Sequence, residues 1–513
     1  MVRKEPIPVL MVTLPALISI YLGIELGYIS FLLPLFITLV FLSFFLSSWF
    51  IIVPHCQFFK NGLLIFFGIF IGLSVLFSLQ VKNKPLRTLA LRKSITSVYG
   101  ELLSDPMPAG TDYYRVSFKV EQASTIVGGV YSAHGMISVF FPRDYVLQSM
   151  PGGIAVSTMP GLFLAKGLRV TVPVKQGSSI KGQQDRFYFN NTSVNTDVSN
   201  PQWKSRTSRL RAGLRFSLIK TLYDWKEPGG LLLALLSSNR DYIPPHLAQG
   251  FRNAGLSHIL ALSGMHLSII AALALGIGIG TGGKKFAVRF SLLVIILFVW
   301  FAGNSPSLDR ALIMAITAVI FKKMGVSVKI VPLLAFSCLI QLLISPADTL
   351  TLAFKLSYVA LAGIILLGRW LTYSIEPFIP SKLSSSITAS IGAQVFTAPI
   401  VSSSIGILAP VGIIAACVTG PIVTLYLVSG IFLLCLVIVF PVLSNIVSNL
   451  YAGLYRFLEV IVLWFSKFPT ILIQDLFANL VTSILCISMI FFIYVLYCRI
   501  STRRIPDALF SRL

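Results

Sequence analysis

Apolar runs, each about as long as a helix that crosses a lipid bilayer, recur along most of this chain. They cover residues 7–27, 29–53, 63–79, 256–280, 286–302, 308–321, 330–344, 350–367, 387–404, 411–440, 442–465 and 471–497. Only 12% of the residues are charged and 56% are hydrophobic, whereas soluble globular proteins carry about twice that charged fraction. The sequence therefore predicts a polytopic α-helical membrane protein with about ten to fourteen spans.

One stretch breaks this pattern. Between residues 98 and 198, short runs alternate between polar and apolar residues and are bounded by Gly, Pro and Asn. Clear examples are residues 114–120, 135–141 and 168–172. Alternation with a period of two predicts β-strands. About five strands over about 100 residues fit a small barrel, including the OB type. Such a barrel binds nucleic acid in some proteins and is purely structural in others.

A basic segment follows the β-rich region. Leu210, Leu214, Leu218 and Leu222 recur at every fourth position, which predicts a helix with an apolar stripe. Its cations and one later arginine form a candidate surface for DNA phosphates or for anionic lipid: Lys204, Arg206, Arg209, Arg211, Arg215, Lys220 and Arg240. The net charge of +23 fits either partner, because loops of membrane proteins also gather cations. The next apolar stretch, residues 229–238, is too short to cross and predicts a partial or surface helix.

Polar residues open the run that begins near residue 256. His258, Ser263, Gly264 and His266 stand where a membrane helix normally carries Leu or Ile. Polar groups at bilayer depth are costly unless they face a partner or water. On one helix the two histidines would lie about 80° apart, which does not fit a zinc pair. Each histidine is either a hydrogen-bonded buried ring or part of a polar path. Ser263 and Gly264 fit a helix irregularity that faces a cavity.

Four further polar side chains lie within or beside later apolar runs. Arg310 stands at a span entrance, where it either reaches back to the interface or faces a polar path. Lys355 lies within a span and needs a partner or water. Two uncharged polar residues, Ser357 and Gln394, are further candidates for lining such a path. In an apolar setting, residues of this kind indicate a route for an ion or a polar solute.

The stretch at residues 255–266, Gly-Leu-Ser-His-Ile-Leu-Ala-Leu-Ser-Gly-Met-His, resembles the signature of the ComEC competence family. Similar elements follow in the family's order, at residues 306–311, 354–358 and 392–399. The chain departs from the family pattern at three places: Lys355 replaces a usual Gln, Ala416 replaces an Asn, and Ser238-Asn239 replaces Gly-Asp before Arg240. The resemblance covers residues 231–423, and the β-rich region extends it upstream.

The resemblance implies an inner-membrane channel for uptake of single-stranded DNA during natural transformation. It implies a DNA path that includes His258, Ser263, Gly264, His266, Arg310, Lys355, Ser357 and Gln394. It divides the chain into N-terminal transmembrane helices (1–80), an extracytoplasmic β-rich OB-like domain (81–200), a basic amphipathic segment (201–250), a competence-type channel domain (251–440) and C-terminal transmembrane helices with a short cytoplasmic tail (441–513). The implied partners are single-stranded DNA, the lipid bilayer, a separate nuclease and other competence proteins.

Short-loop charges place both termini in the cytoplasm of a multi-pass protein of the bacterial inner membrane. We expect no cofactor, no metal site and no catalytic residue. Many relatives carry a metallo-β-lactamase-like nuclease with a His-x-His-x-Asp-His cluster, and the five histidines here form no such cluster. We therefore expect no nuclease site in this polypeptide. A transporter or flippase for an anionic small molecule or lipid is the alternative function, and the oligomeric state is left open.

Overall fold

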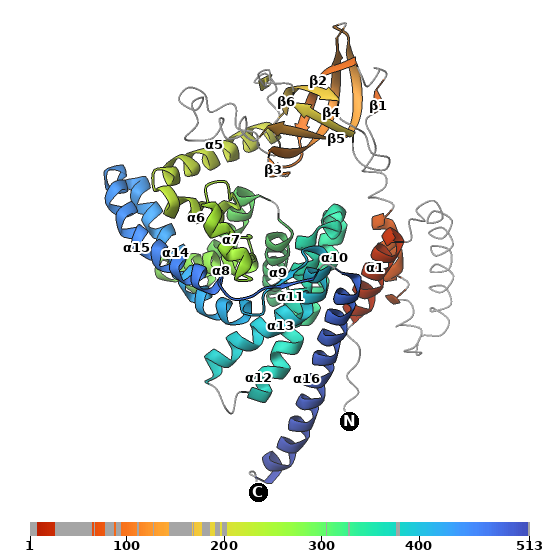
Figure 1. Ribbon diagram of the computed structural model, residues 1–513, viewed down its shortest axis with the longest axis vertical. Coiled ribbons are helices and arrows are strands. Elements are labelled where there is room, and N and C mark those ends of the chain that lie inside the picture. The colour runs from red at the N-terminus through yellow and green to blue at the C-terminus, as the bar shows by residue number, and fades with distance from the viewer. Residues whose placement is uncertain are drawn as a thin grey trace. The chain divides into compact units, whose positions relative to one another are not determined.

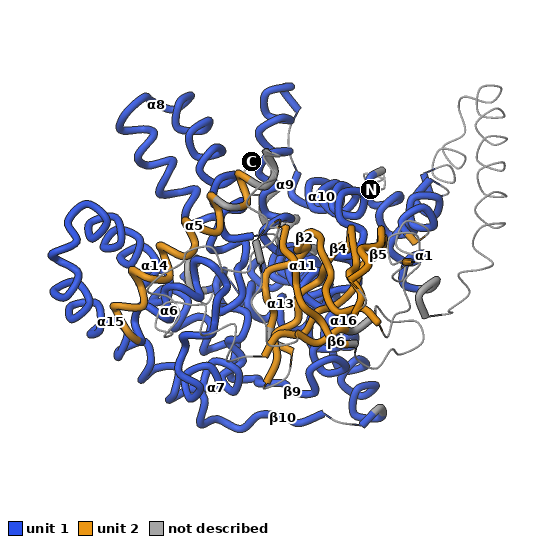
Figure 2. Tube along the Cα trace, turned by 90° about the horizontal axis from the view of Figure 1, so that it is seen from above, with its two compact units in different colours: residues 1–75, 227–513 blue, residues 76–226 orange. Residues whose placement is uncertain are grey.

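The computed structural model describes residues 8–25, 64–65, 67–76, 87–88, 94–109, 112–126, 128–142, 167, 169–176, 185–189, 195–196, 203–303, 305–326, 329–375, 380–473 and 475–510. Two compact units make up the chain (Figures 1 and 2). The β unit is Leu76–Lys226, and the helical unit combines Met1–Val75 with Glu227–Leu513. The predicted run at residues 29–53 lies outside the described residues.

Five strands of the β unit pair in a closed ring: β2 (Ile95–Leu102), β4 (Tyr113–Thr125), β5 (Val130–Pro142), β7 (Asp185–Phe189) and β6 (Arg169–Gln176). β6 pairs with β2 again, β5 and β7 run parallel, and the other pairings are antiparallel. The short strands β1 (Arg87–Thr88), β3 (Met107–Pro108) and β8 (Asn195–Thr196) pair at the margins. The expected β-rich region of about five strands is confirmed.

The alternation read from the sequence sets the core of this ring. Along β4 the buried side chains are Tyr114, Val116, Phe118 and Val120, while the residues between them face outward. A strand places successive side chains on opposite faces. A shift of the strand pairing by one residue would therefore exchange the buried side chains with the outward-facing ones. Helix α5 (Trp203–Tyr223) also belongs to the β unit. This helix is formed by the basic segment in which the leucine spacing predicts a helix.

The helices of the helical unit follow in chain order. They are α1 (Pro8–Glu25), Phe67–Leu76, α6 (Lys226–Ser237), α7 (Pro245–Asn253), α8 (Gly264–Ala302), α9 (Pro306–Lys323), α10 (Ile330–Ile344), α11 (Leu352–Gly363), α12 (Arg369–Ile375), α13 (Ser381–Ser404), α14 (Gly412–Val439), α15 (Ser444–Phe465) and α16 (Leu476–Phe510). Single helical turns lie at Pro346–Leu350 and Pro441–Leu443, and a π-turn at Ile364–Gly368 joins α11 to α12. β9 (Ile407–Leu408) pairs with β10 (Ile471–Leu472).

Five helices among the described residues are long and apolar enough to cross a membrane: Gly264–Ala302, Leu352–Ile375, Gly412–Val439, Pro441–Phe465 and Phe477–Cys498. The chain is therefore an integral membrane protein, as its composition predicts. The run at residues 411–440, which contains Pro421, forms one continuous helix, α14.

Helix α8 is a hairpin of two antiparallel arms. Gly283 has φ 74° and ψ 179°, which no helical residue adopts. The Oγ of Ser291 donates to the backbone oxygen of Ala271 (2.9 Å), and a Cβ on Gly278 would lie 2.6 Å from the Cα of Ala287. The arms therefore match the two spans expected at residues 256–280 and 286–302, except that the first begins at Gly264.

Glycine brings helices together elsewhere in the helical unit. Gly68 and Gly72 stand four residues apart in the helix Phe67–Leu76, and a Cβ on either glycine would collide with the backbone of α1, at Val12 and Ala16. Such close approach is what small residues permit in membrane helices. α6 differs from expectation: residues Pro228 to Ser237 are all buried, so this short helix is internal and not a surface helix. Apolar side chains all round a helix are typical of a buried one.

Candidate functional site

The motif at residues 255–266 forms an irregular connection and a helix start, not one continuous helix. Helix α7 ends at Asn253, Gly255 adopts φ +72°, and α8 starts at Gly264 with Ser263 as its N-cap. The helix irregularity expected at Ser263 and Gly264 is the start of the α8 hairpin. The projection that put the two histidines on one helix is wrong, because the chain between them is not helical.

His266 is a capping residue of α8. Its Nδ1 accepts a hydrogen bond from the backbone amide of Ser263 (3.2 Å) and lies 3.0 Å from the Ser263 hydroxyl. The ring is fully buried, and its Nε2 has no hydrogen-bond partner among the described residues. Because Nδ1 accepts, a neutral ring carries its hydrogen on Nε2. His258, in contrast, lies exposed in the connection before α8.

Arg310 reaches the same helix start from the second turn of α9. A Cβ on Gly264 would lie 3.4 Å from Nη2 of Arg310. The Nη1 of Arg310 donates to the backbone oxygen of Ser357 in α11, and its guanidinium carbon lies 5.8 Å from the centre of the Tyr358 ring. Its Nε is buried without a hydrogen-bond partner in the described part of the chain. The structure thus brings together five predicted residues: Ser263, Gly264, His266, Arg310 and Ser357.

A network of buried polar groups continues from Arg310 between α9, α10 and α11. The hydroxyl of Tyr358 donates to Oε1 of Gln341 (3.0 Å) and lies 3.4 Å from Oγ of Ser337. Nε2 of Gln341 donates to Oδ2 of Asp348 (3.2 Å) and to the backbone oxygen of Pro306 (3.3 Å). Gln341 and Ser337 are almost fully buried. We call Arg310, Ser337, Gln341, Asp348, Ser357 and Tyr358 the polar network.

Four members of this network were missed by the sequence analysis: Ser337, Gln341, Asp348 and Tyr358. One signal was available, because Gln341 is an amide inside the apolar run Ile330–Ile344 and a polar group there needs a partner. The pairing itself is tertiary. It joins residues 7 and 17 positions apart in the chain, on separate helical elements, and no local spacing reveals it.

Gln394 lies at a second close contact made by the motif. A Cβ on Gly412 would lie 2.7 Å from Nε2 of Gln394 and 3.4 Å from the Cα of Gly255. A Cβ on Gly255 would in turn lie 3.0 Å from the Cβ of Ala409. α13, the start of α14 and the connection before α8 therefore meet closely at Gly255.

Lys355 lies apart from the polar network. Its ammonium is 4.9 Å from the centre of the Tyr21 ring in α1, and the Tyr21 hydroxyl donates to the backbone oxygen of Thr349 (2.8 Å). This cation–π contact supplies the partner that a lysine within a span needs.

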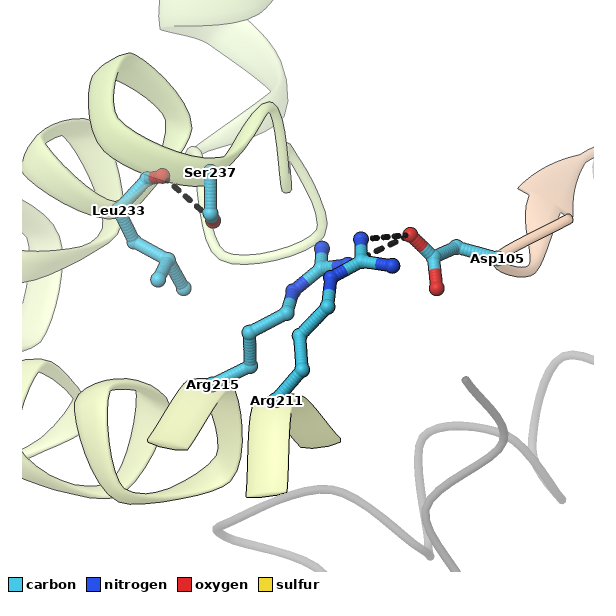
Figure 3. A network of polar contacts seen from close by, with 5 residues as sticks. All are labelled: Asp105, Arg211, Arg215, Leu233 and Ser237. Carbon is cyan, nitrogen blue, oxygen red and sulfur yellow. Dashed lines mark hydrogen bonds and ion pairs between the residues drawn. The ribbon is translucent and has the colours of Figure 1, made fainter. Parts of the chain in front are cut away.

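The basic helix α5 displays fewer cations than expected. Arg211 and Arg215 are 6% and 8% exposed, and both pair with Oδ2 of Asp105, at 3.0 and 2.5 Å (Figure 3). Burial lowers the pKa of Arg211, and the Asp105 carboxylate raises it in partial compensation. These two arginines hold α5 to the loop after β2, so their assignment to a DNA- or lipid-facing surface is corrected. Four residues per step advance a helix by about 40°, so the leucine stripe spirals and Leu210 and Leu214 are exposed.

The other predicted cations divide into two groups. Arg206 and Lys220 are exposed on α5. Arg240 is exposed after α6, where the like charge of Arg252 repels it. Lys204 and Arg209 lie on α5, but their side chains are outside the described residues. Among the described residues, no group of three or more His, Cys, Asp or Glu side chains is arranged to hold a metal ion.

One segment of the chain matches a known protein family. Residues 235–499 match the family described as Competence protein, and this segment contains the motif, Arg310, the polar network and Gln394. The chain belongs to the competence protein family. A curated member from Bacillus subtilis (strain 168), ComE operon protein 3, is 26% identical over 172 residues, 33% of this chain and 22% of that protein. The alignment thus spans about a fifth of the relative's length. No solved structure matches the chain.

Proposed function

We propose that this competence family protein is an inner-membrane channel that carries single-stranded DNA into the cytoplasm during natural transformation. The observation that carries the proposal is the placement of Arg310, a half-buried cation beside the first turn of α8 and within the polar network. A guanidinium and a helix start both favour an anion, and a DNA strand presents one phosphate per nucleotide.

The polar network supports this role by its position. It lies within the family-matched segment and links α9, α10 and α11 through hydrogen bonds between polar groups. Polar side chains that face the interior of a membrane protein mark ion and substrate pathways in general. In this proposal Arg310 and Ser357 contact the passing strand, and Gln341, Asp348 and Tyr358 fix their position. His258 and Gln394 border the path from the connection before α8 and from α13.

Lys355 and His266 take indirect roles in the proposal. Lys355 holds α11 against α1 through Tyr21, and His266 fixes the start of α8 through Ser263. The chain itself catalyses no covalent step, and a separate nuclease and other competence proteins act with it. Both termini lie in the cytoplasm. The β unit is extracytoplasmic and of the OB type, which its strand order and its parallel β5–β7 pairing support.

Transformation of a deletion strain with labelled DNA tests this function. We expect DNA to reach the periplasm but not the cytoplasm without the protein, and the intact chain to restore entry. Unchanged entry in the deletion strain would overturn the proposal. The half-buried Arg310 would then fit an anionic small molecule or a lipid headgroup, since either carries negative charge as a DNA phosphate does.

A further inference from the structure

Five side chains lie next to one another on five adjacent strands of the β unit, all on the same face of the sheet. The register places Met107 of β3 opposite Arg115 of β4, Arg115 opposite Phe140 of β5, Phe140 opposite Tyr188 of β7, and Tyr188 opposite Lys175 of β6. Paired residues in a sheet point to the same face. The neighbours of Arg115, Phe140 and Tyr188 along their strands are buried in the core, so the row faces outward. We call these five residues, together with Tyr113 on the same face of β4, the outer row.

Aromatic rings occupy the middle of the outer row. The rings of Phe140 and Tyr188 stack with centroids 5.4 Å apart and an interplanar angle of 29°. Tyr113, at the start of β4, meets Tyr188 edge-on at 5.5 Å. Tyr113 is 38% exposed, and Phe140 and Tyr188 are half-buried. Cross-strand aromatic pairs stabilise a sheet, but that role alone does not require rings to stay accessible on the outside.

Cations flank these rings on both sides. Arg115 and Lys175 are exposed, and neither forms an ion pair with a carboxylate in the described part of the β unit. Arg169 differs, since it is bonded to Glu121 at 3.3 Å. The outer row therefore places two available positive charges beside three aromatic rings.

We infer that the outer row is a binding surface for single-stranded DNA, which stacks unpaired bases on Tyr113, Tyr188 and Phe140 and places phosphates near Arg115 and Lys175. Aromatic faces flanked by cations bind unpaired strands in this way with little sequence preference. In small barrels of the OB type the second and third strands carry the oligonucleotide-binding face, and here these are β4 and β5. The inference rests on the proposed function, because it names where the β unit receives the strand.

Binding of a labelled oligothymidine of about 12 nucleotides to the full chain in lipid nanodiscs tests the inference. We expect Tyr113→Ala and Tyr188→Ala each to weaken binding about tenfold, the effect of removing one stacked base. Tyr188→Phe keeps the ring and should bind as the unchanged protein does. Tyr131→Ala is the matched control, since Tyr131 is 39% exposed on β5 but lies outside the outer row. Its binding should be unchanged.

An oligonucleotide of the same length without bases separates stacking from charge. The unchanged protein should bind it at least about a hundredfold more weakly, because every stacked base is lost at once, and Tyr113→Ala should cause no further loss. Equal affinity for both oligonucleotides, or equal losses with Tyr113→Ala and Tyr131→Ala, would overturn the inference. Because Tyr113 is exposed, its variant is expected to fold even where Tyr188→Ala does not. Failure of DNA uptake to depend on the chain would refute the proposed function while leaving this binding result intact.

Discussion

The backbone amide of Ser263 donates to Nδ1 of His266, so a histidine from the family motif closes the first turn of a membrane hairpin. The third residue after an N-cap is where Glu or Gln usually returns a hydrogen bond to the cap backbone. His266 fills that position with a ring that is fully buried. The motif is therefore partly structural: it fixes where the chain becomes helical beside Arg310.

Replacement of His266 tests this capping role. His266→Ala removes the acceptor for the Ser263 amide and should lower the free energy of unfolding by about 1 kcal/mol. His266→Gln supplies a side-chain oxygen at the same position and should recover most of that loss. Thermal unfolding of the purified protein in detergent measures both. Equal stability of the Ala and Gln variants would show that the hydrogen bond is unimportant.

The close approach at Gly255 predicts that alanine is destabilising there but not at a glycine with open space around it. Gly255→Ala should lower the free energy of unfolding by about 1–2 kcal/mol, because φ +72° disfavours a Cβ. Its new Cβ would also lie only 3.0 Å from that of Ala409. Gly420→Ala is the control. Gly420 lies in α14 with open space around its Cβ position, and alanine should stabilise that helix by about 0.5–1 kcal/mol. Thermal unfolding in detergent ranks the two variants. A Gly255→Ala variant as stable as Gly420→Ala would contradict the contact.

Asp105 couples α5 to the strands of the β unit. Asp105→Asn leaves two largely buried guanidinium groups without their carboxylate, and we expect a loss of about 2 kcal/mol in the stability of this unit. Arg215→Met in the Asp105→Asn background should cost less than Arg215→Met alone, because the pair is already broken. Limited proteolysis between β2 and α5 reports the change. Additive losses in this double-mutant cycle would argue against a direct pair.

The spans, the β-rich region and the two arms of α8 could be predicted from hydropathy and alternation, since both signals are local. The candidate site could be predicted only in part. Arg310 and Ser357 were recognised as polar residues in apolar surroundings, and the structure joins them directly. Their coupling to Gln341 and Asp348 depends on how α9, α10 and α11 pack, and sequence spacing carries no such information. Arg211 was misassigned for a similar reason, because its partner Asp105 lies 106 positions away.

Tyr358 links two members of the polar network: its ring lies against Arg310, and its hydroxyl donates to Gln341. Tyr358→Phe removes the hydrogen bond to Gln341 and leaves that buried amide oxygen unpaired, at a cost of about 1–3 kcal/mol. The double variant Tyr358→Phe with Gln341→Leu removes both partners and should be closer to the unchanged protein. Unfolding in detergent measures the difference. A double variant less stable than Tyr358→Phe would contradict the network.

The central claim is that Arg310 contacts the DNA strand within the membrane. It is tested most directly by replacing each of two cations, Arg310 and Lys355, with methionine and comparing the two variants. Arg310→Met and Lys355→Met each remove one cation from the helical unit and keep an unbranched side chain. Entry of labelled DNA into the cytoplasm is measured at matched protein levels in the membrane. We predict that Arg310→Met reduces entry at least about tenfold, the loss of one charge-assisted contact, while Lys355→Met reduces it much less. Normal entry with Arg310→Met would contradict the account.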